Sequence, residues 1–310
     1  MTAAIGVDIG GTKIAFALVD QEGQVLAEHR LPTLADEGAE AVFDRVAQGV
    51  RHLLDQSDGQ VAGVGIGTPG HLNPYTGVVH GATNLGWREV HLLDGVRQRL
   101  DLPVWVQKDT NAGALGEMFF GAARGCQDFV YLAVGTGLGG GAVVDGELVL
   151  GARYTAMEIG HMPFNPTGRL CRCGMRGCPE MYVSGNGLLA GVHEHLPGYP
   201  DSLLADIPDL DTTRILDAVQ ADDPLALAVI HEAVEWLVGV MVCCMDILNP
   251  ALFVVGGGLG HAASDWFVQG AQQAFYRRVT PDIHQHIQVV ASQVANSAVG
   301  PACLVWYGLR

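Results

Sequence analysis

Residues 158–180 hold the densest group of metal-binding side chains in this sequence. Cys171, Cys173 and Cys178 lie within eight residues of one another, and His161 lies ten residues before the first of them. Three thiolates and one imidazole complete a tetrahedral zinc shell, with metal–ligand distances of about 2.0–2.3 Å. The spacing therefore predicts a structural zinc site with these four residues as its ligands.

Two other interpretations of these thiols are weaker. A disulfide network is disfavoured because the chain has 7 cysteines, an odd number, and because its N-terminus lacks the basic and apolar segments of a secretory signal. Core filling is disfavoured because three thiols within eight residues are too dense for it. Gly174 and Gly177 let the backbone turn tightly between the ligands. Four further cysteines are expected to be buried and inert, namely Cys126, Cys243, Cys244 and Cys303.

Glu158 and Glu180 are interleaved with the zinc ligands, although the metal shell is complete without them. A closed metal site that holds two carboxylates in place suggests a scaffold for a polar substrate pocket.

Length and charge narrow the function. The 310 residues are enough for two domains with buried cores. The formal net charge of -16 argues against nucleic acid or an anionic membrane as the main partner, although backbone amides can still bind an anionic ligand. The longest apolar run, 234–248, carries two carboxylates and is too short to span a bilayer, so it predicts a buried helix.

Three glycine-rich segments follow apolar stretches of the chain, at 8–12, 135–140 and 256–260. Glycine lets successive backbone amides approach a phosphate and form an anion-binding nest. One such segment alone is more often an ordinary turn. None fits the P-loop pattern, and the first two connect strand to strand, which excludes a Rossmann unit. Together they predict a nucleotide held between two domains by hairpin turns.

Residues 4–31 and 128–150 share one plan of strand, glycine turn, strand, hairpin turn and strand. Two copies of this plan imply two related domains that face each other. The expected strands are 5–8, 14–19 and 24–31 in the first copy, and 129–134, 141–144 and a segment after Asp145-Gly146 in the second.

Helices and strands alternate through the rest of the chain. We expect helices at 36–56 and 90–100, strands at 60–70, 103–109 and 252–260, and a long apolar helix that ends at Asn249-Pro250. This alternation predicts an α/β fold with mixed sheets and a cleft, in which the chain crosses from the first domain to the second near 112–125.

In chain order these motifs resemble the signatures of the ROK family (repressor, open reading frame, kinase), which comprises sugar kinases of the hexokinase–actin superfamily. The resemblance covers nearly the whole chain, its thiol motif is the most specific part, and it is nearest to bacterial glucokinases. The matching motifs are DIGGTK (8–13), TNLGW (83–87), DTNAGALGEMFFGAARG (109–125), GTGLGGG (135–141), EIGH (158–161), CRCGMRGCPE (171–180) and VVGGGL (254–259).

The resemblance implies two ribonuclease H-like domains of the actin/hexokinase type, with mixed sheets flanking a deep interdomain cleft. Residues 1–113 and 298–310 would form the smaller domain, with the first phosphate loop and the catalytic aspartate. Residues 114–297 would form the larger domain, with the second phosphate loop, the zinc site and the adenosine loop. The implied reaction is ATP-dependent phosphorylation of glucose at its 6-hydroxyl in glycolysis. The implied enzyme is cytoplasmic, a homodimer or homotetramer, and binds neither nucleic acid nor membrane.

Asp109 is the candidate catalytic base. It follows a short apolar strand and opens a helix whose amides and dipole favour the ionised carboxylate. The same position also suits a simple N-cap. The resemblance favours the base, because the family's catalytic aspartate falls on Asp109.

The resemblance also assigns the other site residues. Asn84, Glu158, His161 and Glu180 would bind the sugar hydroxyls together with Asp109. One ring nitrogen of His161 would bind a structural zinc ion, which leaves the other N–H for the sugar. Asp8 would contact Mg²⁺ through a water molecule. The remaining ATP contacts would be Gly10, Gly11, Thr12, Lys13, Thr136, Gly137, Gly257 and Gly258.

Lys108 departs from the family pattern, which has asparagine before the catalytic aspartate. A lysine cannot accept a hydrogen bond from the sugar. Either Lys108 turns to solvent or phosphate, or it replaces the amide contact from another angle, and in both cases the sugar preference is affected more than catalysis.

Two alternative functions follow from the same motifs. The sugar could be N-acetylglucosamine, N-acetylmannosamine or fructose instead of glucose. A sugar-sensing repressor is expected to carry a DNA-binding helix-turn-helix before the first domain, whereas here Asp8 already belongs to the first phosphate loop and the net charge is -16.

Overall fold

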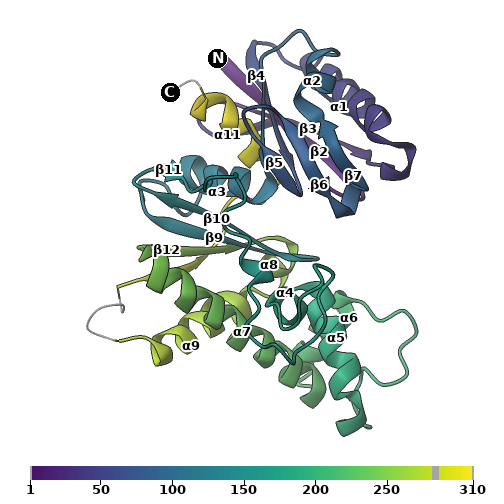
Figure 1. The fold of residues 1–310 in the computed structure, drawn as a ribbon, viewed down its shortest axis with the longest axis vertical. Helices are drawn as coiled ribbons and strands as arrows, with labels where there is room; N and C mark the ends of the chain where they lie inside the picture. Colours follow the sequence, from purple (N-terminus) through teal and green to yellow (C-terminus); the bar gives the residue numbers. More distant parts are fainter. Residues whose placement is uncertain (1, 281–285, 309–310) are drawn as a thin grey trace. The chain divides into compact units, whose positions relative to one another are not determined.

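The computed structural model describes residues 2–280 and 286–308 (Figure 1). The chain forms two compact units. Unit 1 comprises Met1–Gln127, Gly141–Ala156 and Gln293–Arg310, and unit 2 comprises Asp128–Gly140 and Met157–Ser292. The domain boundaries expected from the sequence, and the cleft, stay predictions.

Unit 1 is built on a five-stranded sheet with the strand order β3-β2-β1-β4-β8. The first three strands form an antiparallel meander, whereas β4 runs parallel to β1 and to β8. The predicted glycine turn and hairpin turn join the strands of the meander, at 10–12 and 20–24. The bounds are β1 (Thr2–Ile9), β2 (Lys13–Val19), β3 (Val25–Pro32), β4 (Gln60–Thr68) and β8 (Val104–Lys108).

The two faces of this sheet differ in side-chain size. Large residues such as Ile5 and Phe16 pack in one core with α1 (Ala39–Leu54) and α2 (Leu92–Arg97). Alternate positions carry small residues such as Ala15 and Ala17, which pack on the side of α11 (Val299–Tyr307). Since side chains alternate along a strand, one sequence provides both faces.

Helix α11 lies against glycines of the central strands. A Cβ atom at Gly6 would lie 1.8 Å from the carbonyl oxygen of Ala298, and one at Gly65 would lie 1.8 Å from that of Pro301. Both positions therefore require glycine. On the same face, α11 also packs on α3 (Asp109–Phe120).

A small antiparallel sheet in unit 1 corrects one sequence expectation. The helix expected over 90–100 begins only at Leu92, because Val90 and His91 pair with a neighbouring strand. The sheet has the order β5-β6-β7 and comprises β5 (His71–Asn73), β6 (Val78–Ala82) and β7 (Trp87–His91). Two 3₁₀ turns complete the unit, η1 (Ala35–Glu37) and η2 (Thr83–Leu85).

The second five-stranded sheet has the order β11-β10-β9-β12-β13, and the division between the units falls within β10. Antiparallel β10 and β11 correspond to β2 and β3, while parallel β9, β12 and β13 correspond to β1, β4 and β8. The predicted internal repeat is thus confirmed. The bounds are β9 (Phe129–Val134), β10 (Leu138–Val144), β11 (Glu147–Leu148), β12 (Leu252–Gly256) and β13 (Gln288–Ala291).

Strand β10 begins at Leu138 and not at Gly141 as expected. The glycine turn closes early, because the N–H of Gly135 donates to the carbonyl of Gly137 at 3.0 Å. Residues 138–140 are therefore free to extend the strand.

Unit 2 is rich in helices. They are η3 (Ile159–His161), α4 (Glu180–Val183), α5 (Gly185–His195), η4 (Leu196–Gly198), α6 (Thr212–Gln220), α7 (Pro224–Leu248), α8 (Gly258–Ala262), the π-helix η5 (Asp265–Gly270) and α9 (Ala271–Arg278). Figure 1 shows α7 as the long central helix of this unit, and α4, α5, α6, η5 and α9 all pack on it.

Helix α7 begins at Pro224, ten residues before the apolar run that the sequence analysis marked. Asp223 caps it and accepts hydrogen bonds from the N–H groups of Leu225 and Ala226 at 3.0 and 2.9 Å. With 25 residues it is the one helix of the described chain that is long and apolar enough to cross a membrane, a test that buried core helices also pass. The apolar run at 234–248 lies in a helix with a buried face, as predicted, but it is only the second part of that helix.

All seven cysteines lie in described residues, and none forms a disulfide. Cys244 and Cys303 are buried as expected, whereas Cys126 and Cys243 are only half-buried, which corrects the expectation for these two.

Candidate active site

The first glycine loop, 10–12, joins β1 to β2 in unit 1. The N–H of Gly10 donates to the carbonyl of Lys13 at 2.9 Å, and the carbonyl of Gly10 accepts a hydrogen bond from the hydroxyl of Thr33 at 2.7 Å. A Cβ atom at Gly11 would lie 3.2 Å from the carbonyl oxygen of Asn84. The loop therefore approaches Asn84, the predicted sugar ligand on η2.

Asp8 lies on β1 directly before this loop and is half-buried. Burial raises the pKa of the Asp8 carboxyl, while a hydrogen bond from Ser297 and the charge of Lys13 act in the opposite direction. A carboxylate in such a position is stabilised by a nearby cation, and oxygen ligands suit Mg²⁺.

Asp109 is the first residue of α3 and follows β8 directly, as the sequence predicted. Its Oδ1 accepts a hydrogen bond from the N–H of Thr110 at 2.7 Å. In the register of the parallel strands, Asp8 pairs with Gly67 and Gly67 pairs with Gln107. Asp8 and Asp109 thus come to the carboxyl edge of the same sheet.

Lys108 is buried, with 8% of its surface exposed. This exposure disagrees with a Lys108 side chain that turns to solvent, whereas its turning to phosphate or replacing the amide contact stay predictions. The N–H of Lys108 donates to Oε1 of Gln107 at 2.9 Å, and Nδ2 of Asn111 donates to the same oxygen at 3.2 Å. Lys13 and Lys108 are the only lysines in the sequence.

The four predicted zinc ligands lie together in unit 2. His161, Cys171, Cys173 and Cys178 each offer one ligand atom, and these atoms lie within 4.8 Å of one another. Nδ1 of His161 is 3.6 Å from Sγ of Cys171, and Sγ of Cys173 is 3.6 Å from Sγ of Cys178. A tetrahedral ion with Zn–S bonds of about 2.3 Å has edges of about 3.8 Å between its sulfur ligands. The cluster therefore fits zinc.

The turns around the thiols depend on glycine, as predicted. Gly174 and Gly177 have φ angles of 91° and 68°, which other residues rarely adopt. The N–H of Gly174 donates to the carbonyl of Cys171 at 3.0 Å and closes the turn between the ligands.

Burial favours the neutral form of two of the three thiols in the cluster. Burial raises the pKa of the Cys178 thiol to about 12, and Cys171 and Cys173 add to this shift. Burial also raises the pKa of Cys171. For Cys173 burial acts upward, but hydrogen bonds from Met175 and from the neighbouring thiols outweigh it, so that its pKa lies below the ordinary value. Zinc binding has to displace these protons.

Glu158, His161 and Glu180 all lie beside the second glycine loop, 135–140. Oε2 of Glu180 accepts a hydrogen bond from the N–H of Leu138 at 3.1 Å. A Cβ atom at Gly160 would lie 2.1 Å from the carbonyl oxygen of Leu138, so η3 packs directly on the loop. The N–H of His161 donates to the carbonyl of Glu158 at 3.0 Å. Glu180 thus contacts Leu138 directly, and the turn that carries Glu158 and His161 packs on the same residue.

A cavity of about 660 Å³ in unit 2 adjoins the glycine loops. Gly135 and Thr136 line it, as does Gly258 at the start of α8. Its described lining carries two carboxylates, Asp211 and Asp217, and neither lysine nor arginine. The volume is that of an ordinary small-molecule site, and its polar acceptors suit the hydroxyl and amino groups of a nucleoside.

Gly257 does not line the cavity but positions the strand end beside it. Its φ angle is 85°, and a Cβ atom would lie 2.4 Å from the carbonyl oxygen of Val134 on β9. Only glycine lets the chain turn into α8 at this point.

Three residues near the candidate site were not predicted from the sequence, namely Thr33, Asp211 and Asn186. Thr33 is fully buried, and its N–H donates to the carbonyl of Thr12 at 2.9 Å, which fixes the first glycine loop from the end of β3. Asp211 caps α6 through the N–H of Arg214 at 2.9 Å, and Asn186 also lines the cavity. Only Asp211, which precedes two threonines at a helix start, carries a recognisable sequence signal.

The two five-stranded sheets have the same strand order, and in each a glycine turn follows the first strand. This is the α/β fold of the hexokinase type. The chain belongs to the ROK family, whose model matches residues 4–306.

Several known proteins are similar to this chain. A glucokinase of Streptomyces coelicolor is 34% identical over 98% of this chain and 98% of its own length. The crystal structure of a ROK family glucokinase from Streptomyces griseus in complex with glucose and AMPPNP has a TM-score of 0.87 and 34% identity, and covers 99% of this chain and 100% of that one. A xylose repressor of Caldicellulosiruptor bescii is 29% identical over 97% of this chain and 76% of its own length.

Proposed function

We propose that this sugar kinase transfers the terminal phosphoryl group of ATP to the 6-hydroxyl of glucose. The proposal is supported by the hydrogen bond from Leu138 to Glu180 and by the packing of η3, which Glu158 precedes and His161 ends, on the same residue. Carboxylates accept hydrogen bonds from neighbouring hydroxyls, and an imidazole N–H donates one, which together suit a polyol.

In the proposed reaction, Asp109 accepts the proton of the attacking hydroxyl. Phosphoryl transfer relies on positioning and electrostatic stabilisation more than on covalent chemistry, so a base at a fixed helix start suits it. The proposed sugar ligands are Asn84, Asp109, Glu158, His161 and Glu180.

ATP binds with its nucleoside part in the 660 Å³ cavity and its phosphates at the glycine loops. The proposed contacts are Gly10, Gly11, Thr12, Lys13, Thr136, Gly137, Gly257 and Gly258. Asp8 faces Mg²⁺, which supplies charge neutralisation to the phosphates when bound.

Zinc has a structural role in this proposal. The Nδ1 of His161 faces the thiols, so its Nε2 is the nitrogen left to meet the sugar. We further propose a cytoplasmic enzyme of glycolysis, a homodimer or homotetramer, that binds neither nucleic acid nor membrane.

A coupled assay of ADP formation across a sugar panel tests the function. We expect the highest kcat/KM for glucose among glucose, mannose, galactose, fructose, N-acetylglucosamine and N-acetylmannosamine, with ATP and Mg²⁺ present. A higher kcat/KM for an acetylated sugar or for fructose would show that glucose is not the preferred substrate, although the sugar kinase activity would stand. If none of these sugars is phosphorylated, the proposed function is wrong.

A further inference from the structure

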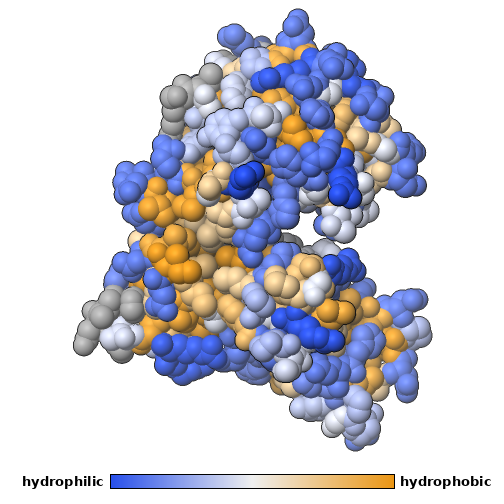
Figure 2. Space-filling model, in the orientation of Figure 1, coloured by the Kyte–Doolittle hydropathy of each residue, from blue (hydrophilic) through white to orange (hydrophobic). Residues whose placement is uncertain are grey.

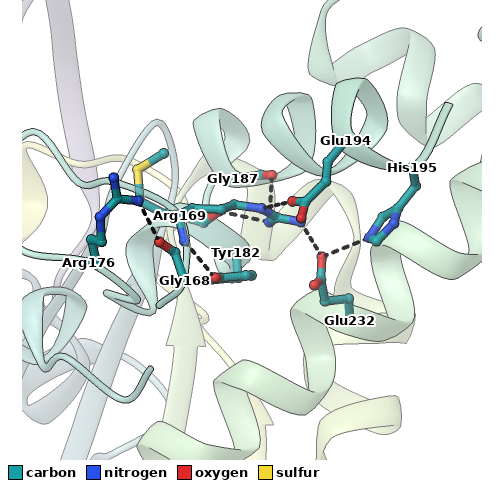
Figure 3. A network of polar contacts seen from close by, with 9 residues as sticks. Gly168, Arg169, Arg176, Tyr182, Gly187, Glu194, His195 and Glu232 are labelled. Atoms are coloured by element: carbon teal, nitrogen blue, oxygen red, sulfur yellow. Dashed lines mark hydrogen bonds and ion pairs between the residues drawn. The ribbon is translucent and has the colours of Figure 1, made fainter. Parts of the chain in front are cut away.

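An arginine between His161 and Cys171 lies almost wholly inside unit 2 (Figure 3). The side chain of Arg169 is only 10% exposed. Its Nε donates to Glu194 at 2.6 Å, and its Nη2 donates to Glu232 at 2.7 Å. The two carboxylates belong to α5 and α7, so the side chain of Arg169 joins the segment 158–180, which carries the predicted zinc ligands, to two helices.

The same arginine also binds α4, whose first residue is Glu180. Nη1 donates to the carbonyl of Met181 at 2.9 Å, and the backbone N–H of Arg169 donates to the Tyr182 hydroxyl at 3.0 Å. The guanidinium carbon lies 4.2 Å from the centre of the Tyr182 ring, and Trp236 of α7 stacks on this ring at 3.7 Å. At these separations the two groups cover opposite faces of the ring.

These contacts differ in how much water screens them. Glu194 is 56% exposed and Glu232 is 27% exposed, and exposed ion pairs contribute little. The hydrogen bond to the carbonyl of Met181 is partly buried, and Tyr182 is only 6% exposed. A guanidinium offers five N–H donors in a fixed plane, so it can bind helix and carboxylates together, whereas a lysine cannot.

Helix α4 needs such support, because it has only four residues. A single turn of helix is not stable by itself. Its first residue, Glu180, accepts the hydrogen bond from Leu138 in the second glycine loop. A Cβ atom at Gly137 would lie 2.6 Å from Oε2 of Glu180, which leaves the carboxylate little room in any other position.

We propose that Arg169 is a positioning residue that fixes α4 and thereby holds the Glu180 carboxylate in place for a sugar hydroxyl. This inference rests on the proposed function for the role of Glu180. Arg169 acts through Met181 and Tyr182 and does not itself contact the sugar. The zinc cluster anchors the chain before α4, and Arg169 anchors the helix itself.

Arg169→Met and Arg169→Lys test this role, with Arg278→Met as the matched control. Arg278 also pairs with a glutamate of α7, Glu235, but does not bind α4. Displacing a substrate-binding group can cost roughly 100-fold. We expect Arg169→Met to raise the KM for glucose at least about tenfold, with less change in kcat, and Arg169→Lys to recover only part of the loss. The zinc content should stay at the wild-type value in all three variants.

A readout without sugar separates this inference from the proposed function. Hydrogen–deuterium exchange of the peptide that contains residues 135–140 reports the hydrogen bond from Leu138 to Glu180. We expect faster exchange there in both Arg169 variants and unchanged exchange in Arg278→Met. If the wild type phosphorylates no sugar, the proposed function is wrong. The hydrogen–deuterium exchange at residues 135–140 then tests by itself whether Arg169 positions Glu180.

Equal exchange at 135–140 in wild type and in the Arg169 variants would overturn the proposal. So would a lower melting temperature with an unchanged KM for glucose, because Arg169 would then only stabilise the fold. If Arg169→Met does not fold, Tyr182→Phe replaces it, since this change removes only the hydroxyl that accepts the Arg169 N–H. A smaller rise in KM and in exchange is expected for Tyr182→Phe, and no change in either would refute the role.

Discussion

Asp109 carries the most specific residue-level prediction. We expect Asp109→Asn to lower kcat by about 10²–10⁴-fold, because loss of a general base has this cost. Sugar binding should persist, since the amide keeps most of the polar contacts of the carboxylate. Steady-state kinetics and calorimetric binding of glucose measure the two effects. Asp101→Asn, an exposed change in the same unit, is the control. A kcat near wild type would end the assignment of Asp109 as the base.

Lys108 bears on the choice of sugar. It is buried directly before Asp109, where the family has asparagine. If Lys108 has displaced a sugar contact, one hydroxyl donor lacks its acceptor, at a cost of about 1–3 kcal/mol. We expect Lys108→Asn to tighten selectivity for glucose over mannose, galactose and N-acetylglucosamine by roughly ten- to a hundredfold in kcat/KM.

The burial of Lys108 can be checked independently. The sequence has only two lysines, and Lys13 is exposed. An amine-reactive reagent, read out by mass spectrometry, should label Lys13 and spare Lys108. Equal sugar ratios in wild type and Lys108→Asn would show that the side chain points away from the sugar.

At the scale of elements, the segment 158–180 carries both the predicted zinc ligands and the predicted sugar ligands Glu158 and Glu180. We expect about one zinc ion per chain, and we expect Cys173→Ala to lose it. The variant should melt at a lower temperature and have a higher KM for glucose, because the turns before Glu180 lose their anchor. Metal analysis, thermal unfolding and kinetics measure these outcomes. Cys243→Ala, outside the cluster, should change none of them. Fully active wild-type protein without zinc would contradict the prediction.

The start of α7 predicts a dependence on pH. Burial alone would raise the pKa of Asp223, but hydrogen bonds from Ala226, Leu203, Ser202 and Leu225 hold it below its ordinary value. A carboxyl with a lower pKa in the folded state stabilises the fold above its unfolded pKa, about 3.9, and this contribution is lost as the pH falls through the folded pKa.

We therefore expect Asp223→Ala to lower the free energy of unfolding by about 0.5–2 kcal/mol at neutral pH, as for other N-caps. The difference from wild type should shrink in acid below about pH 4. Urea unfolding at several pH values measures it, with Asp246→Ala on the exposed side of α7 as control. A difference that stays constant down to pH 2 would refute the role of the charge.

Glycine turns and alternating side chains were the most reliable guides from the sequence. Residues 129–134 form β9 as predicted, and α3 begins at Asp109 as predicted. The start of α7 was not predicted, although Asp223-Pro224 is a recognisable helix start. The continuous apolar run at 234–248 marks only the second part of this helix. The partners of Arg169 lie 25 and 63 residues away along the chain, and no local pattern marks contacts of that kind.

At the scale of the whole molecule, the net charge of -16 predicts weak contact with nucleic acid. The ROK family includes repressors such as the xylose repressor similar to this chain, so the point is worth testing. We expect no binding to mixed-sequence or operator-like duplex DNA at physiological salt, with or without glucose. Fluorescence anisotropy of labelled duplexes measures it. Tight, sugar-dependent binding would favour a regulator over a kinase.

The place of α11 in unit 1 has a consequence for biosynthesis. The first segment of this unit ends at residue 127, but α11, which covers Gly6 and Gly65, begins only at residue 299. A ribosome that adds about 5–20 residues per second needs about 9–34 s for the 172 residues in between. Throughout that interval Gly6 of β1 and Gly65 of β4 lack the helix that covers them. Strands β1 and β4 therefore leave the ribosome long before the helix that completes their packing, and a chain that stops before residue 299 would leave this sheet face incomplete.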